Sequence, residues 1–96
     1  MFLISLTYRV APEEVDRHLE AHAAFLDRHY AAGHFVFSGP KVPRTGGVIL
    51  AHGLSHEAVM QLISEDPFYL NSIANYHVQE LQPTKWDPRF APFAGG

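Results

Sequence analysis

The 96-residue chain contains no cysteine, which excludes a disulfide framework, a thiolate nucleophile and a cysteine-ligated zinc site. It also lacks an excess of positive charge, since ten acidic side chains outnumber seven basic ones and the formal net charge is -3. That balance argues against nucleic acid, whose protein partners present a basic face. No apolar run approaches the roughly 18 residues that a membrane helix needs. We therefore expect neither nucleic acid nor a membrane as a partner.

The apolar N-terminus, MFLISLTYRV, does not have the pattern of a signal peptide. A basic leading region is missing, and Ser5, Thr7 and Arg9 interrupt the apolar residues. We expect a soluble cytoplasmic protein with one domain, because 96 residues correspond to a single core. A domain of this size buries a limited amount of apolar surface, so a second copy of the chain is an expected partner.

The hydrophobic periodicity predicts four strands, two helices and one helical turn. Phe2 to Arg9 alternates between apolar and polar residues, as a strand with one buried face does. Pro12 suits the first turn of a helix and Gly33 suits the position just after its end, so a helix is predicted over residues 12–32. The remaining predictions are strands at 34–38 and 47–52, a helix from the N-cap Ser55 to Glu65, a helical turn at 66–71 and a strand at 73–82.

The order β-α-β-β-α-β, with short connections, predicts a ferredoxin-like α+β sandwich. Its antiparallel sheet carries both helices on one face and leaves the other for a second subunit, so residues 1–83 form the domain. Residues 84–96 are rich in proline and aromatic residues and cannot form a regular helix. We interpret them as an arm that packs on the domain or at a dimer interface.

Histidines are concentrated between Arg17 and Pro40, a stretch that holds four of the seven in the chain. At about 100° per residue, one apolar stripe runs along the predicted helix. His22 lies closest to this stripe and is expected to be half-buried. The stripe consists of Val15, Leu19, Ala23, Leu26 and Tyr30.

The histidines have two other possible roles, which are metal binding and an ordinary place on the surface or on a strand face. His18 and His22 are four residues apart, a possible metal-ligand spacing, but no glutamate follows His18 and the H-E-x-x-H pattern is absent. We therefore assign no metal or other cofactor. The other histidines are expected on the surface or on a strand face: His29, His34, His52, His56 and His77.

Several motifs in this order resemble the YciI-like family. They are Arg17 and His22 on the first helix, Gly33, the sequence Ser38-Gly39-Pro40, the start LSHEAV of the second helix, and Asp66-Pro67-Phe68. The resemblance covers roughly Met1 to Pro83. It implies a dimeric α+β barrel in which two ferredoxin-like units pack their sheets together. It also implies a histidine–aspartate pair in a cleft, which corresponds here to His22 and Asp66.

A histidine–carboxylate pair is chemically useful because the carboxylate fixes the imidazole tautomer. The second ring nitrogen can then take or give a proton near neutral pH. Such a pair can enolise a carbonyl compound, isomerise a lactone or assist the loss of a leaving group. Similar folds house muconolactone isomerase-like and dehydrochlorinase-like proteins. We therefore expect a lyase, isomerase or dehydrochlorinase without a cofactor; the alternative is a non-catalytic small-ligand-binding or accessory dimer.

Structural roles remain open for the same residues. His22 can bond a backbone carbonyl, and Asp66 can cap the turn that begins at Pro67; one carboxylate oxygen can cap while the other meets His22. An RNA-binding sheet is a third hypothesis, disfavoured because the paired aromatic pattern is missing from the middle strands.

The residues expected around the small-molecule ligand are Ser38, Gly39, Pro40, Phe68, Tyr8 and Arg9.

Overall fold

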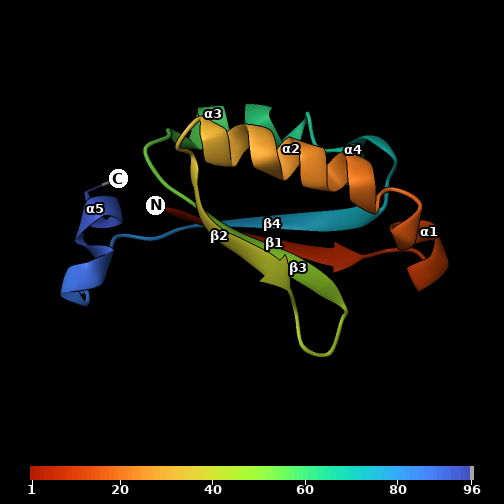
Figure 1. Ribbon diagram of the computed structural model, residues 1–96, viewed down its shortest axis with the longest axis horizontal. Coiled ribbons are helices and arrows are strands. Elements are labelled where there is room, and N and C mark those ends of the chain that lie inside the picture. Colours follow the sequence, from red (N-terminus) through yellow and green to blue (C-terminus); the bar gives the residue numbers. More distant parts are fainter. Residues whose placement is uncertain (96) are drawn as a thin grey trace.

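The structure, a computed structural model, describes residues 1–95 (Figure 1). Its elements follow the order β1 (Phe2–Tyr8), α1 (Pro12–Asp16), α2 (Leu19–Ala31), β2 (Phe35–Pro40), β3 (Gly46–Ala51), α3 (His56–Ile63), α4 (Pro67–Leu70), β4 (Ala74–Glu80), the 3-10 helix η1 (Pro88–Phe90) and α5 (Ala91–Ala94). None of the helices in residues 1–95 is long and apolar enough to cross a membrane.

The four strands form one antiparallel sheet in the order β2-β3-β1-β4. The central strand β1 pairs with β3 from Phe2↔Ala51 to Thr7↔Gly46 and with β4 on its other side. Figure 1 shows α2, α3 and α4 over one face of the sheet, and no described helix over the opposite face. The predicted ferredoxin-like fold is therefore confirmed.

The strand alternation places a core between the sheet and the helices. Phe2, Ile4 and Leu6 of β1 are fully buried there, as the sequence pattern predicts. Ser55 caps α3 by accepting a hydrogen bond from the Ala58 N–H, and Gly33 follows α2 with φ +79°. These local signals place α2 and α3 against the sheet, so that side chains from both can meet above it.

The first helix differs from the prediction because it is interrupted. α1 ends at Asp16 and α2 begins at Leu19, with His18 outside helical geometry at φ -110° and ψ 2°. On one straight helix Val15 and Phe25 would point about 80° apart. The interruption lets both be buried, at 0% and 1% exposure.

The interruption also corrects the predicted buried stripe. Leu19 and Tyr30 are 39% and 38% exposed, whereas Phe25 and His29 face the core. His29 is therefore a buried residue and not the surface residue that the sequence suggested. β2 extends through Gly39 and Pro40, two residues beyond the predicted strand at 34–38.

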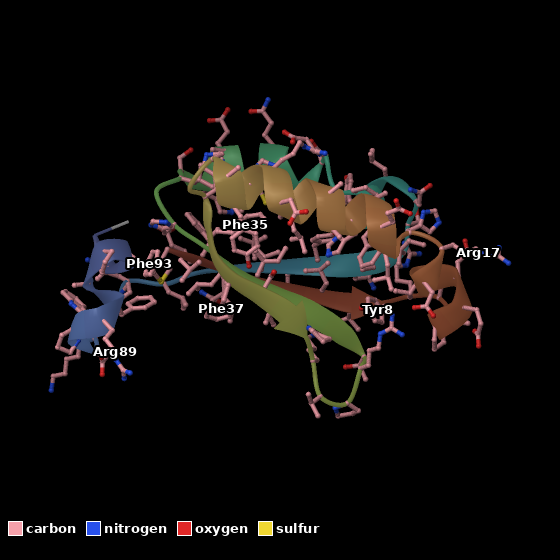
Figure 2. The ribbon with its side chains drawn as sticks, viewed as in Figure 1. Tyr8, Arg17, Phe35, Phe37, Arg89 and Phe93 are labelled. Atoms are coloured by element: carbon pink, nitrogen blue, oxygen red, sulfur yellow. The ribbon has the colours of Figure 1, made fainter. Side chains whose placement is uncertain are left out.

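The chain continues beyond the sheet after β4 and leads into the predicted C-terminal arm. The first backbone N–H after β4, at Leu81, donates to the Met1 carbonyl over 2.7 Å. Phe93 packs edge-on against His52, with ring centroids 5.3 Å apart. Figure 2 shows Arg89 and Phe93 at the end of the molecule opposite to Arg17. Trp86 is 48% exposed, so this aromatic ring is only partly covered by its own chain.

Candidate active site

His22 and Asp66 meet although they are 44 residues apart in the sequence. His22 lies on the second turn of α2 and Asp66 is the N-cap of α4. The distance from His22 Nδ1 to Asp66 Oδ1 is 2.8 Å. The side chain of His22 is 13% exposed and that of Asp66 is 1% exposed. The pair is thus a buried contact whose histidine alone reaches solvent.

Asp66 accepts three hydrogen bonds. Its Oδ1 accepts from the Phe68 backbone N–H at 3.0 Å as well as from His22, and its Oδ2 accepts from the Tyr76 hydroxyl at 2.5 Å. Burial raises the pKa of Tyr76 far above its usual value, and the charge of Asp66 and their hydrogen bond raise it further. Tyr76 therefore stays protonated and donates a hydrogen bond to the carboxylate.

These contacts assign the tautomer of His22. Because the partner oxygen is a carboxylate that also accepts from a backbone N–H, Nδ1 of His22 must carry the proton. Nε2 makes no hydrogen bond to any residue in 1–95, and in the neutral ring it holds a lone pair. The ring stacks on Phe68 with centroids 3.9 Å apart and planes 2° apart, which fixes its orientation. The imidazole is therefore held on one nitrogen and one face.

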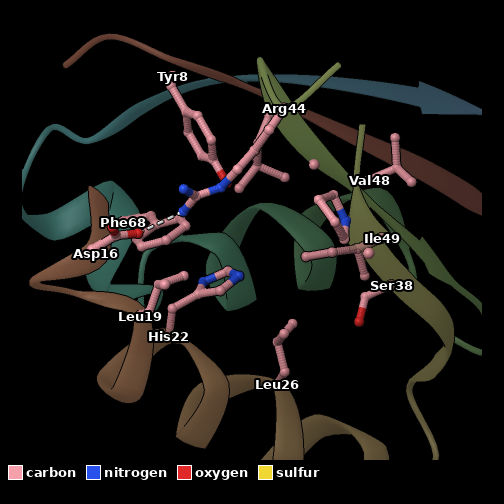
Figure 3. Close-up of a pocket in the computed structure, with 14 residues that line it drawn as sticks. Tyr8, Asp16, Leu19, His22, Leu26, Ser38, Arg44, Val48, Ile49 and Phe68 are labelled. Atoms are coloured by element: carbon pink, nitrogen blue, oxygen red, sulfur yellow. Dashed lines mark hydrogen bonds and ion pairs between the residues drawn. The ribbon is translucent and has the colours of Figure 1, made fainter. Parts of the chain in front are cut away.

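A pocket of about 480 Å³ opens beside this histidine, between α2 and the sheet. Its walls are mostly apolar, and Figure 3 shows His22 pointing into it from α2. Leu19 and Leu26 line the helix side and Ile49 the sheet side. Asp66 is buried and does not line the pocket, whereas His22 and Phe68 do.

Five of the six residues expected around a ligand line this pocket: Tyr8, Ser38, Gly39, Pro40 and Phe68. The Ser38 hydroxyl is hydrogen-bonded to the Tyr30 hydroxyl at 2.8 Å. The sixth, Arg9, is not among the residues that line this pocket. It follows the last residue of β1, and its backbone N–H donates to the Ile73 carbonyl.

Two contacts of the site were not predicted from the sequence. One is the hydrogen bond from Tyr76 to Asp66, although the position of Tyr76 on the same strand face as Val78 was a signal, since that face meets the helices. The other is an ion pair between Arg44 Nη2 and Asp16 Oδ1, 2.8 Å long, in which both residues line the pocket. The hydrogen bond that Arg44 donates to Asp16 raises the pKa of Arg44, so the guanidinium stays charged.

A second histidine–carboxylate pair lies two turns along α2. His29 Nε2 is 3.2 Å from Glu65 Oε1, and His29 Nδ1 is 3.0 Å from His34 Nδ1. His29 donates from Nε2 and accepts from His34, and it packs against Phe25 and Phe35. None of these residues lines the pocket. The pair joins α2 to the segment after α3 and is a structural contact.

His18 and His22, whose spacing is possible for metal ligands, have separate partners in the structure. His18 Nε2 lies 3.5 Å from Glu14 on α1, while His22 bonds Asp66. Within residues 1–95, no group of three histidine, aspartate or glutamate side chains is arranged to hold a metal ion.

Comparison with known proteins identifies the family. No curated protein matches the chain significantly. One similar solved structure is 5-chloro-2-hydroxyhydroquinone dehydrochlorinase (TftG) from Burkholderia phenoliruptrix AC1100, in complex with 2,5-dihydroxybenzoquinone. The chains are 22% identical, the match covers 83% of this chain and 91% of that one, and the TM-score is 0.72, which shows a shared fold. The profile of the YCII-related domain matches residues 1–82, as the resemblance implied. The chain therefore belongs to the YCII-related domain family.

Proposed function

We propose that this protein is an enzyme that acts on a small organic molecule by proton transfer at His22, in a reaction of the lyase, isomerase or dehydrochlorinase type. The observation that carries the proposal is the orientation of one imidazole. Its Nδ1–H is bound to a buried carboxylate, and its ring enters a pocket of about 480 Å³. A general base needs this arrangement, with one nitrogen anchored and the other available to the substrate.

Asp66 and Tyr76 support this role without touching a substrate. Asp66 holds the tautomer and stabilises the imidazolium that forms when Nε2 takes a proton. Tyr76 and the Phe68 N–H hold the carboxylate in place, so it cannot rotate away from His22. In the proposal, His22 is the general acid/base and the other two are positioning residues.

The fold neighbour supports an elimination as the reaction. TftG is a dehydrochlorinase of a chlorinated hydroxyhydroquinone and was found with a dihydroxybenzoquinone. In such a step Nε2 of His22 takes a proton from the substrate, the released electron pair forms the new double bond, and chloride leaves with its bonding pair. The step gains and loses no electrons overall, so it requires no redox cofactor. Leu19, Leu26 and Ile49 supply apolar walls for the ring of such a substrate.

The direct test is chloride release from 5-chloro-2-hydroxyhydroquinone, followed by a chloride electrode against the rate without protein. The wild-type chain should accelerate release, and His22→Gln should reduce the acceleration by about 100-fold or more, the scale of general acid–base catalysis. His56→Gln is the matched control, because His56 is exposed on α3 and outside the pocket. Equal rates in wild-type and His22→Gln would refute the role of His22. Binding of 2,5-dihydroxybenzoquinone without chloride release would favour a ligand-binding or accessory protein.

We further propose that two copies pack through the open face of the sheet. Leu3, Phe37, Val48 and Leu50 lie on that face by strand register, and Phe37 is 49% exposed. Figure 2 shows Phe37 on the side of β2 away from the helices. Sedimentation at micromolar concentration should give a dimer mass, and Phe37→Glu should lower it. A monomer in both cases would contradict this assembly, and with it a dimer-interface role for the arm.

A further inference from the structure

Arg44 reaches over the candidate active site from the loop between β2 and β3. Its guanidinium carbon lies 5.8 Å from the centre of the Tyr8 ring, and Nη2 bonds Asp16 on α1. Figure 3 shows Arg44 and His22 entering the pocket from opposite sides, the loop and α2. The space between them is where a small ligand would lie.

Arg44 is the one lysine or arginine among the described residues that line the pocket. A guanidinium has five N–H donors. Within residues 1–95, Nη2 is hydrogen-bonded to Asp16, and a hydrogen bond with Tyr8 also helps to raise the pKa of the guanidinium. These two partners do not use all five donors, so further donors can meet a ligand. The pair is also exposed, at 41% for Arg44 and 55% for Asp16, so water or a ligand can replace the contact.

We propose that the pocket selects anionic small molecules, and that Arg44 binds their negatively charged oxygen while His22 acts on the proton. This rests on the proposed function of the same pocket and adds the substrate class to it. An enolate, the anion of a hydroxyquinone or a carboxylate has such a negatively charged oxygen. Asp16 then competes with the ligand for one guanidinium, so it weakens anion binding and prevents the cation from binding anions indiscriminately.

The position of Arg44 suits the charge that elimination produces. When a base removes a proton from a hydroxyl-bearing ring, negative charge collects on oxygen. A fixed cation near that oxygen stabilises the charge without reorganising solvent. The apolar walls supplied by Leu19 and Ile49 lower the local dielectric constant, which strengthens this attraction.

Calorimetric titration of two probes tests the proposal. 2,5-Dihydroxybenzoquinone is a vinylogous acid and is anionic at neutral pH; its dimethyl ether has the same ring without the charge. The wild-type chain should bind the anion more tightly than the ether. Arg44→Gln should weaken anion binding by roughly 10- to 100-fold, the range for a hydrogen bond to a charged group, with little effect on the ether. Arg44→Lys should retain part of the affinity.

The decisive variant is Asp16→Asn. If Arg44 binds the anion, this substitution should strengthen anion binding by roughly two- to five-fold, because it removes a competitor. If the ion pair only ties α1 to the β2–β3 loop, Asp16→Asn and Arg44→Gln should weaken binding alike. Arg9→Gln is the matched control, since Arg9 lies outside the pocket, and it should leave binding unchanged.

The outcomes separate this inference from the proposed reaction. Preferential anion binding that depends on Arg44, without chloride release, would keep the inference and refute the reaction. Chloride release that is undiminished in Arg44→Gln would refute the inference and keep the reaction. No binding of the anion, a preference for the ether, or equal loss in the Asp16 and Arg44 variants would also overturn the inference.

Discussion

Replacing Asp66 by asparagine tests whether the buried carboxylate stabilises the site or only caps a helical turn. Asparagine is as good an N-cap as aspartate, so the cap alone predicts no loss of stability. In the structure the buried carboxylate accepts from three donors. The asparagine NH₂ group would face the Tyr76 hydroxyl in place of Oδ2 and donate to its oxygen, so the hydroxyl hydrogen would lose its acceptor.

The expected cost follows from those contacts. One buried donor left without an acceptor costs about 1–3 kcal/mol, so Asp66→Asn should lower the free energy of unfolding by about 2 kcal/mol. Asp66→Ala leaves all three donors unpaired and should cost about 3–6 kcal/mol, a large share of the stability of a small domain. Urea unfolding followed by circular dichroism measures both, at equal protein concentration because self-association shifts the midpoint.

The chain supplies its own control. Asp87 precedes Pro88 and accepts a hydrogen bond from the Arg89 N–H, so it caps η1 as Asp66 caps α4, but on the surface. Asp87→Asn should leave the unfolding curve unchanged. If Asp66→Asn also leaves the unfolding curve unchanged, the carboxylate only caps α4 and the reasoning is refuted. In a double-mutant cycle Tyr76→Phe should cost about 1–2 kcal/mol in the wild-type background and close to nothing beside Asp66→Asn.

Three further predictions concern the surroundings of the site. The folded chain holds the pKa of Tyr76 above its unfolded value, so this contribution to stability is complete below about pH 10 and lost as pH rises further; the unfolding free energy should fall less steeply with pH in Tyr76→Phe. Gly46→Ala should cost more than about 2 kcal/mol, because a Cβ there would lie 1.8 Å from the Leu6 carbonyl oxygen, whereas Gly39→Ala, with no atom within 4 Å, should unfold like the wild type. His29→Ala should cost about 2–3 kcal/mol by leaving a cavity, yet leave binding of 2,5-dihydroxybenzoquinone intact.

The sequence predicted the features that depend on neighbouring residues. The alternation of Phe2 to Tyr8, the cap at Ser55 and the Asp66-Pro67 turn are local signals, and each appears in the structure where the pattern placed it. The element order then determined the ferredoxin-like topology. The meeting of His22 with Asp66 needed the family resemblance, because no local signal joins residues 44 positions apart.

The failures have one physical source, which is tertiary packing. The interruption at Arg17 and His18 contains no proline or glycine, so no local signal predicts it. A helical wheel drawn through it placed Leu19 in the buried stripe and overlooked Phe25. The ion pair between Arg44 and Asp16 was not predicted, because it depends on how the β2–β3 loop meets α1.

The central claim is that His22 presents an unprotonated Nε2 to a ligand while Asp66 holds its Nδ1–H. Nitrogen-15 NMR of the histidine ring, before and after addition of 2,5-dihydroxybenzoquinone, measures this most directly. In the free protein with a neutral His22 ring, we predict a proton on Nδ1 and a pyridine-like Nε2, and the Nε2 signal should move when the ligand binds. A proton on Nε2 with Nδ1 bare, or an Nε2 signal unmoved by saturating ligand, would contradict the account.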